Sequence, residues 1–117
     1  MLLIGSTAIK HWFPDFDRIP KDKDYAISLE ESKLLKSSKE IEYLVIPPLN
    51  VCNEEIASPD VLLTLKMSHL VVTDINWEKH MYDVNFLLNK GASVISNLFY
   101  ELYTQSITDI FKDFSSK

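Results

Sequence analysis

The period of the hydrophobic pattern changes near the middle of the chain, and this change constrains the fold more than any other feature. Residues 22–29 alternate between apolar and polar side chains, which predicts a strand with one apolar face. Residues 41–46 are rich in β-branched and aromatic side chains and predict a second strand. After Ser58 the apolar residues recur at helical spacing instead. The sequence therefore predicts an α+β fold, with a sheet in the N-terminal half and helices in the C-terminal half.

Turn and cap residues set the boundaries of the other elements. The apolar run 2–4 ends at Gly5-Ser6 and predicts a short buried strand, followed by a helix over 6–13 with Ser6 as its N-cap. Residues 58–59, Ser-Pro, are typical of a helix start, and Gly91 is typical of the position after a helix end. The second half predicts helices over 58–72 and 76–90, and one or two further helices over 93–104 and 106–114. The expected buried stripe of the second of these helices is Trp77, Met81, Val84 and Leu88.

The composition predicts one domain that folds without a covalent cross-link. The chain has 117 residues, 46% of them hydrophobic, which suits a single domain over residues 1–117 with a sheet core in 1–50 and a helical part in 58–114. The formal net charge of −5 makes duplex DNA an unfavourable partner. One cysteine, Cys52, excludes an intramolecular disulfide and a cysteine-based zinc site. No apolar run is long enough to span a membrane, and we expect a cytoplasmic protein.

A glycine-serine pair, Gly5-Ser6, joins the first predicted strand to the first helix. Glycine lets the backbone approach a ligand closely, and the N-terminus of the following helix offers unpaired N–H groups to an anion. The corner therefore suits a phosphate group. By itself, such a pair is more typical of a tight turn with a serine cap.

Two aspartates, Asp22 and Asp24, stand at the start of the second predicted strand. Residues i and i+2 of a strand point to the same face, so the two carboxylates lie side by side. In a cleft such a pair needs a cation, and Mg²⁺ prefers carboxylate oxygens. The alternative is a solvated strand end among other charges.

One acidic residue, Glu42, interrupts the next strand, which is otherwise apolar. If the two strands are neighbours, Glu42 can join the aspartates on one face. A single glutamate on a strand is more often exposed to solvent, and Glu40 competes with Glu42 because it lies two residues away on the same face.

The chain carries three motifs in a fixed order: a strand joined to a helix by Gly-Ser, then Asp-x-Asp, then a glutamate between apolar residues. This combination resembles the nucleotidyltransferase superfamily, whose core is similar to the palm of polymerase β. The chain looks most like small nucleotidyltransferase-like proteins of bacteriophages, over about residues 2–90. The stretches that carry this resemblance are 3–9, 11–16, 21–24, 59–69 and 77–83. The resemblance implies a small mixed sheet of the minimal nucleotidyltransferase type, packed by helices.

The resemblance also implies roles for particular residues. Gly5 and Ser6 would hold the phosphates of a nucleoside triphosphate. Asp22, Asp24 and Glu42 would be the catalytic carboxylates and the ligands of two Mg²⁺ or Mn²⁺ ions, with Glu42 placed to help deprotonate an acceptor hydroxyl.

Polar residues on the helical half extend this expected site. The resemblance suggests that Lys66, His69 and His80 line the nucleotide cleft, with Lys66 as a counter-charge to phosphate. The alternative is a solvated helix face that carries a weak Lys79–Asp83 ion pair.

The implied activity is transfer of a nucleoside monophosphate from a nucleoside triphosphate, with ATP as the expected donor, to a hydroxyl of a protein, an RNA or a small molecule. One alternative is a catalytically inactive phage protein of the same fold that binds a host protein or a nucleotide. Another is a component of a larger enzyme. For a phage protein we expect the host cytoplasm.

Overall fold

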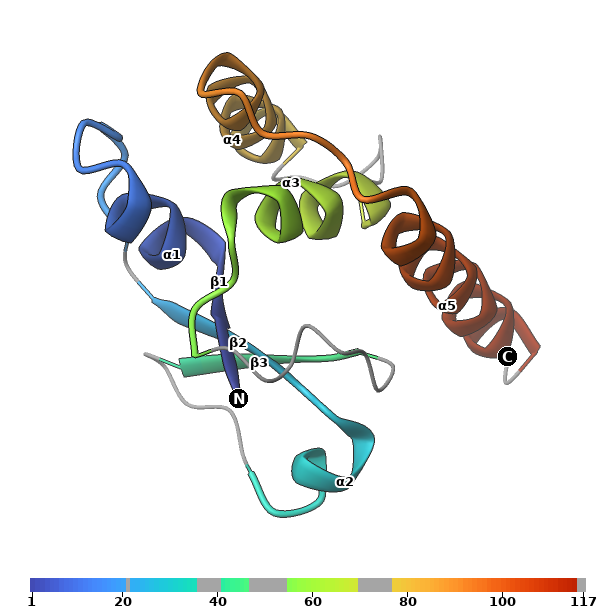
Figure 1. Cartoon of the computed structure of the whole chain (residues 1–117). Coiled ribbons are helices and arrows are strands. Elements are labelled where there is room, and N and C mark those ends of the chain that lie inside the picture. Colours follow the sequence, from blue (N-terminus) through green and yellow to red (C-terminus); the bar gives the residue numbers. More distant parts are fainter. Residues whose placement is uncertain (21, 36–40, 47–54, 70–76, 116–117) are drawn as a thin grey trace.

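The computed structural model describes the backbone of residues 1–20, 22–35, 41–46, 55–69 and 77–115, and the side chains in these ranges up to residue 105. The elements are β1 (Leu2–Ile4), α1 (Gly5–Trp12), β2 (Lys23–Ile27), α2 (Leu29–Ser32), β3 (Ile41–Val45), α3 (Pro59–Ser68), α4 (Trp77–Asn89) and α5 (Ser96–Ser115). Figure 1 shows the strands of the N-terminal half on one side and most of the helices on the other. The predicted α+β fold is confirmed.

The sheet is mixed and follows the order β1-β2-β3. β1 pairs antiparallel with β2, and β2 pairs parallel with β3. A parallel bridge joins Leu3 of β1 to Ile56, with hydrogen bonds of 2.9 Å from the Leu3 N–H to the Glu55 carbonyl and from the Ala57 N–H to the Leu3 carbonyl. The chain just before α3 is thereby attached to β1.

The register of the three strands decides which side chains share a face. Asp24 is the partner of Ile4 on one side and of Glu42 on the other, so these three residues form one row across the sheet. The face of the sheet that carries this row is directed toward helices α1 and α3. Tyr25 and Tyr43 form the next row and point to the opposite face, where their ring centroids lie 6.2 Å apart. The sheet therefore presents two carboxylates on the side that the helices cover.

Helix α3 lies at the centre of the helical layer and packs against α1, α4 and α5 (Figure 1). Five consecutive residues, 61–65, are buried, as expected for a helix with neighbours on several sides. Its side chains also hold the chain before α5: Asp60 Oδ1 accepts from the Ser93 N–H at 2.8 Å, and Thr64 Oγ1 accepts from the Ile95 N–H at 3.0 Å. The position of α3 is thus fixed on one side by the attachment of the preceding chain to β1 and on the other by the segment that leads into α5.

Two predicted helix boundaries are confirmed. The Ser58 side chain caps α3 by accepting from the Val61 N–H at 3.3 Å, and Pro59 is the first helical residue. Gly91 follows α4 with a φ of +92°. Hydrogen bonds from the Gly91 N–H to the Leu88 carbonyl and from the Ala92 N–H to the Leu87 carbonyl close the helix end in the Schellman pattern.

Two local expectations are wrong. Ser6 does not cap α1, because the helix begins at Gly5 and Ile4 occupies the cap position without a side-chain hydrogen bond. Leu29 does not continue β2. Ser28 instead caps α2 through a capping box, in which the Ser28 hydroxyl accepts from the Glu31 N–H and the Glu31 carboxylate accepts from the Ser28 N–H, both at 3.2 Å. Leu29 is therefore helical and exposed.

The buried face of α4 also differs from the predicted stripe. It consists of Asp83, Val84 and Leu87, whereas Leu88 is exposed and Trp77 and Met81 are half-buried. The buried face therefore includes Asp83, whose ion pairs are described below.

The two C-terminal segments predicted at 93–104 and 106–114 form one helix, α5. Leu98 and Leu102 are buried as expected, while Val94 is exposed and precedes the helix. The side chains of Ile107, Ile110 and Phe114 lie outside the described residues, as do the predicted end of the third helix at 72 and the start of the fourth at 76. Within the described ranges, no helix has both the length and the apolar character needed to cross a bilayer.

Candidate functional site

Two adjoining cavities lie between the sheet and the helices, with volumes of about 320 Å³ and about 250 Å³. They share Asp24, Glu42, Lys66 and His80. The larger cavity is also lined by Ile4, Gly5, Tyr43, Leu44, Leu62, Leu65 and His69, and the smaller one by Ser6, Arg18, Asp22 and Lys79. Each of the eight residues that the sequence predicted for the site lines one or both of them.

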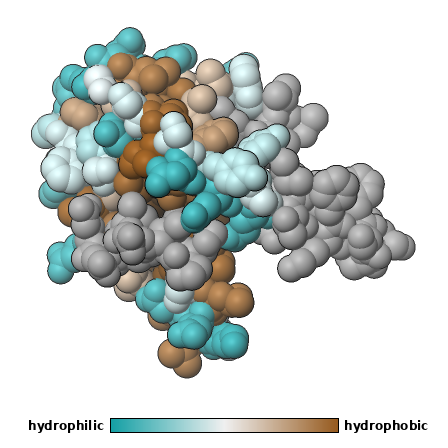
Figure 2. Space-filling view, turned by 45° about the vertical axis from the view of Figure 1, so that its right-hand side comes forward, coloured by the Kyte–Doolittle hydropathy of each residue, from teal (hydrophilic) through white to brown (hydrophobic). Residues whose placement is uncertain are grey.

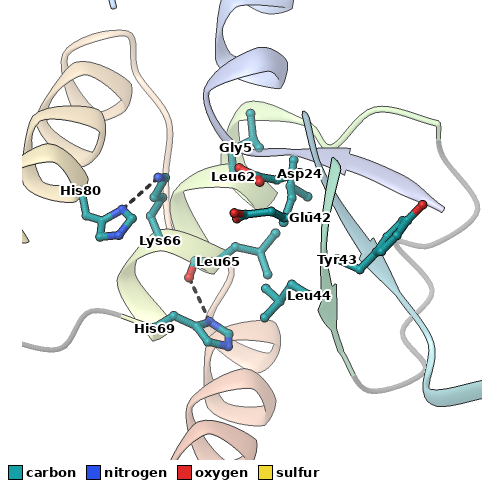
Figure 3. Close-up of a pocket in the computed structure, with 11 residues that line it drawn as sticks. Gly5, Asp24, Glu42, Tyr43, Leu44, Leu62, Leu65, Lys66, His69 and His80 are labelled. Carbon is teal, nitrogen blue, oxygen red and sulfur yellow. Dashed lines mark hydrogen bonds between the residues drawn. The ribbon is translucent and has the colours of Figure 1, made fainter. Parts of the chain in front are cut away.

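One side of the cavities carries three acidic residues, Asp22, Asp24 and Glu42, which we call the carboxylate wall. Asp24 and Glu42 are direct partners on β2 and β3, and Asp22 lies just before β2. Figure 3 shows Asp24 and Glu42 beside each other, pointing toward α3, while Tyr43 points away. Glu40, the competing glutamate, lies outside the described residues.

The carboxylate of Asp24 is held in an unfavourable electrostatic environment. Its partial burial raises its pKa, and the neighbouring charge of Glu42 raises the pKa further, with a smaller contribution from Asp22. Lys66 and Lys79 lower the pKa, but the net direction is upward. The charged form of Asp24 would therefore be stabilised by a cation in the cavity.

The corner at Gly5 touches this carboxylate. Gly5 has a φ of +72°, and a Cβ atom at this position would overlap the Asp24 carboxylate. Thr7, in the first turn of α1, donates from Oγ1 to the Asp22 carbonyl at 3.0 Å. The glycine thus allows a close approach between the start of α1 and the Asp24 carboxylate, whereas the sequence pattern predicted that it would approach a phosphate.

Three basic residues, Arg18, Lys66 and Lys79, also line the smaller cavity, and we call them the basic wall. Lys66 comes from α3, and its Nζ lies 3.1 Å from His80 Nδ1 on α4 (Figure 3). Because an ammonium group only donates, His80 Nδ1 accepts this bond and the ring proton is on Nε2. Lys66 and His80, which the sequence placed on different helices, therefore contact each other at the cavities.

The partner of Asp83 is not the one considered in the sequence. Asp83 is fully buried and pairs with Arg18 and Lys66, rather than with Lys79, among the described residues. Arg18 is not among the site residues predicted from the sequence. Nothing in the local pattern around Arg18 could have assigned it to the site, because its partner is 65 residues away in the chain.

His69 lies apart from the carboxylates. It lines the larger cavity at the end away from Gly5 (Figure 3), and its Nδ1 lies 3.2 Å from the Leu65 carbonyl and 2.9 Å from the Ser68 hydroxyl. The structure therefore brings Lys66 and His80 toward the carboxylate wall and leaves His69 beside the apolar end of the cavity.

The larger cavity combines its charged edge with an apolar lining, formed by Ile4, Leu44, Leu62 and Leu65. Its volume lies at the lower end of the range for small-molecule sites, which are mostly apolar with a few polar groups. On the face shown in Figure 2, hydrophobic residues reach the surface directly beside hydrophilic ones. The arrangement can hold a ligand that has both a charged and an apolar part.

The carboxylate wall has the donor chemistry of a site for a hard divalent cation. Carboxylate oxygens are the ligands that Mg²⁺ takes from proteins, and burial together with the charge of Glu42 keeps the pKa of Asp24 raised despite Lys66 and Lys79. In the part of the chain that the structure describes, no three His, Cys, Asp or Glu side chains are grouped closely enough to hold an ion. The three carboxylates therefore have the donor chemistry for Mg²⁺ but are not gathered around one point, and only Asp24 and Glu42 are direct neighbours on adjacent strands.

The family model described as "Domain of unknown function (DUF7277)" matches residues 1–61, just over half of the chain. The matched region contains the sheet, the carboxylate wall and Arg18, whereas Lys66, His80 and Asp83 lie beyond it. No curated protein and no solved structure matches the chain.

Proposed function

The chain belongs to the DUF7277 family of unknown function, and we propose that it is a metal-dependent nucleotidyltransferase that moves a nucleoside monophosphate from a nucleoside triphosphate to an acceptor hydroxyl. The observation that carries this proposal is the position of the Gly5 corner, the carboxylate wall and the basic wall around two adjoining cavities. The resemblance of the sequence to nucleotidyltransferases supports the same reading.

In this reaction the acceptor oxygen forms a bond to the α-phosphorus, and the bond from that phosphorus to the oxygen leading to the β-phosphorus breaks. Pyrophosphate leaves with that oxygen and its electron pair. The acceptor proton passes to Glu42, which reaches both cavities, and then to solvent. A divalent cation on the carboxylate wall would supply a lower pKa for the acceptor hydroxyl and charge compensation for the pyrophosphate.

The residues around the carboxylates account for binding. Gly5 lines the larger cavity and Ser6 the smaller one, so the N–H groups at the N-terminus of α1 can bind the phosphates. Lys66 offers its charge from the opposite side. The apolar end of the larger cavity lies next to the charged part, so it can take the uncharged part of a nucleotide. We propose ATP as the donor and a cytoplasmic setting, that of the host for a phage protein.

Transfer can be tested by incubating the protein with labelled nucleoside triphosphates, Mn²⁺ and a bacterial lysate. We expect label to be joined to an acceptor, and we expect Asp24→Asn to abolish the transfer. Glu30→Gln is the matched control, since Glu30 is an exposed acid on α2 that lines neither cavity. If no label is transferred with any nucleotide, the proposal is wrong.

A thermal-shift measurement then separates the alternatives, because a ligand that binds the folded state raises the melting temperature. A shift with a nucleotide but without transfer would indicate a nucleotide-binding protein of the same fold. No shift with any nucleotide would favour a protein that binds a macromolecular partner.

A further inference from the structure

Asp83 is a fully buried carboxylate that receives three contacts from two basic side chains. Arg18 donates from Nε to Oδ1 at 3.1 Å and from Nη2 to Oδ2 at 2.6 Å, which is the two-pronged geometry that favours guanidinium–carboxylate pairs. Lys66 Nζ lies 3.0 Å from Oδ2. One carboxylate on α4 therefore joins a cation from the loop after α1 to a cation from α3.

Both cations reach the cavity that the carboxylate wall lines. The side chain of Arg18 is 23% exposed and that of Lys66 is 16% exposed, while Asp83 itself is completely covered. Two like charges so close together would repel one another without a shared counter-ion. Asp83, which is buried and lines neither cavity, supplies that counter-ion.

Two further polar contacts attach the loop that carries Arg18 to α4 and to Lys90, the residue just after this helix. The Tyr82 hydroxyl donates to Asp17, and Lys90 Nζ lies 2.5 Å from Asp15 Oδ2. Neither contact involves a residue that lines the two cavities. The loop would thus remain attached to α4 if only the contact between Arg18 and Asp83 were removed.

We propose that Asp83 is a positioning residue that holds Arg18 and Lys66 together as a paired cationic surface for the polyphosphate of the nucleotide. This inference rests on the proposed function. Arg18 uses two of its five N–H donors on Asp83, and a phosphate in the cavity could bind the others. The smaller cavity is lined by three carboxylates and three basic side chains, so a bound divalent cation would make its lining positive toward a polyanion.

The test is calorimetric titration of the protein with inorganic triphosphate in the presence of Mg²⁺. We expect Asp83→Asn, which keeps the size of the side chain, to weaken binding at least about tenfold. Arg18→Gln and Lys66→Met should weaken it similarly. Because Asp83 acts through these two residues, Asp83→Asn should have no further effect in the Arg18→Gln/Lys66→Met background. An equal loss in both backgrounds would mean that Asp83 has only a structural role and would overturn the proposal.

Lys90→Gln is the matched control, because it removes a contact between the same loop and the residue just after α4, outside the cavities. We expect it to leave triphosphate binding unchanged, and a loss as large as that of Asp83→Asn would contradict the inference. If Asp83→Asn does not fold, unchanged binding in Arg18→Gln and Lys66→Met would still overturn it.

The outcomes also separate this inference from the proposed function. If the unaltered protein does not bind triphosphate, both are wrong. If it binds and Asp83→Asn binds equally well, only the positioning role is wrong. If Asp83→Asn loses binding but no nucleotide is ever transferred, the positioning role stands and the transferase proposal falls.

Discussion

The carboxylate wall and the basic wall are built in different ways. Asp24 and Glu42 are neighbours because two strands pair in register, and the backbone hydrogen bonds of the sheet fix that register. Arg18, Lys66 and Lys79 come from a loop and two helices, and buried Asp83 links the first two. The first wall therefore depends on local strand geometry, and the second depends on a contact between distant parts of the chain.

The largest expected effect comes from breaking the carboxylate wall. Replacing either aspartate, by Asp22→Ala or Asp24→Ala, removes an oxygen donor for the metal. We expect nucleotide transfer to fall at least about a thousandfold, or roughly 4 kcal/mol in activation free energy. The circular dichroism spectrum should stay unchanged. If both variants retain activity in the labelled-nucleotide assay, the catalytic assignment is wrong.

The contact between the Gly5 corner and the sheet can be tested with Gly5→Ala. The new methyl group would meet the Asp24 carboxylate and impose a left-handed backbone on alanine, so we expect a loss of about 2 to 4 kcal/mol in unfolding free energy. Gly91→Ala is the control, since Gly91 also has a positive φ but open space around it, and it should lose only about 1 kcal/mol. Equal losses in urea denaturation would show that the Asp24 contact is unimportant.

The Ser58→Ala variant tests whether triphosphate binding by the basic wall depends on the stability of helix α3. This change removes the N-cap of the helix that carries Lys66 and should lower the unfolding free energy by about 1 kcal/mol. Triphosphate binding should not change, because Asp83 still holds Lys66. A parallel loss of binding in the same titration would mean that the basic wall depends on general helix stability.

The smallest expected effect is a change in the thermal stability of the metal-free protein, and it comes from Asp24. Its pKa is raised in the folded protein, so the ionised carboxylate destabilises the fold at pH 7. Asp24→Asn removes that cost, and we expect a melting temperature higher by about 1 to 4 °C in the presence of a chelator. The difference should shrink as the pH falls through the folded pKa and vanish below the unfolded pKa of about 3.9. A variant that melts lower at pH 7 would contradict the electrostatic account.

Patterns that depend on neighbouring residues could be read from the sequence. The three strands, the Ser58 cap and the Gly91 helix end follow from short-range preferences. The same is true of the shared face of Asp24 and Glu42, which needed only the assumption that their strands are adjacent.

Features that depend on distant contacts, or on two competing local signals, could not be predicted. A buried Asp83 needs the counter-charges of Arg18 and Lys66, which no periodicity reveals, and the buried face of α4 includes Asp83 rather than Leu88. At Ser28 the alternation of the strand competed with a capping box, and the box prevailed because it satisfies two backbone N–H groups at the start of α2.

The most direct test of the account is a crystal structure with Mn²⁺ and a non-hydrolysable nucleoside triphosphate analogue, in which anomalous scattering locates the metal. The account predicts Mn²⁺ bound to carboxylate oxygens of Asp24 and Glu42, and phosphates that contact Arg18 and Lys66. Metal and nucleotide bound elsewhere, with both cavities holding only solvent, would contradict it.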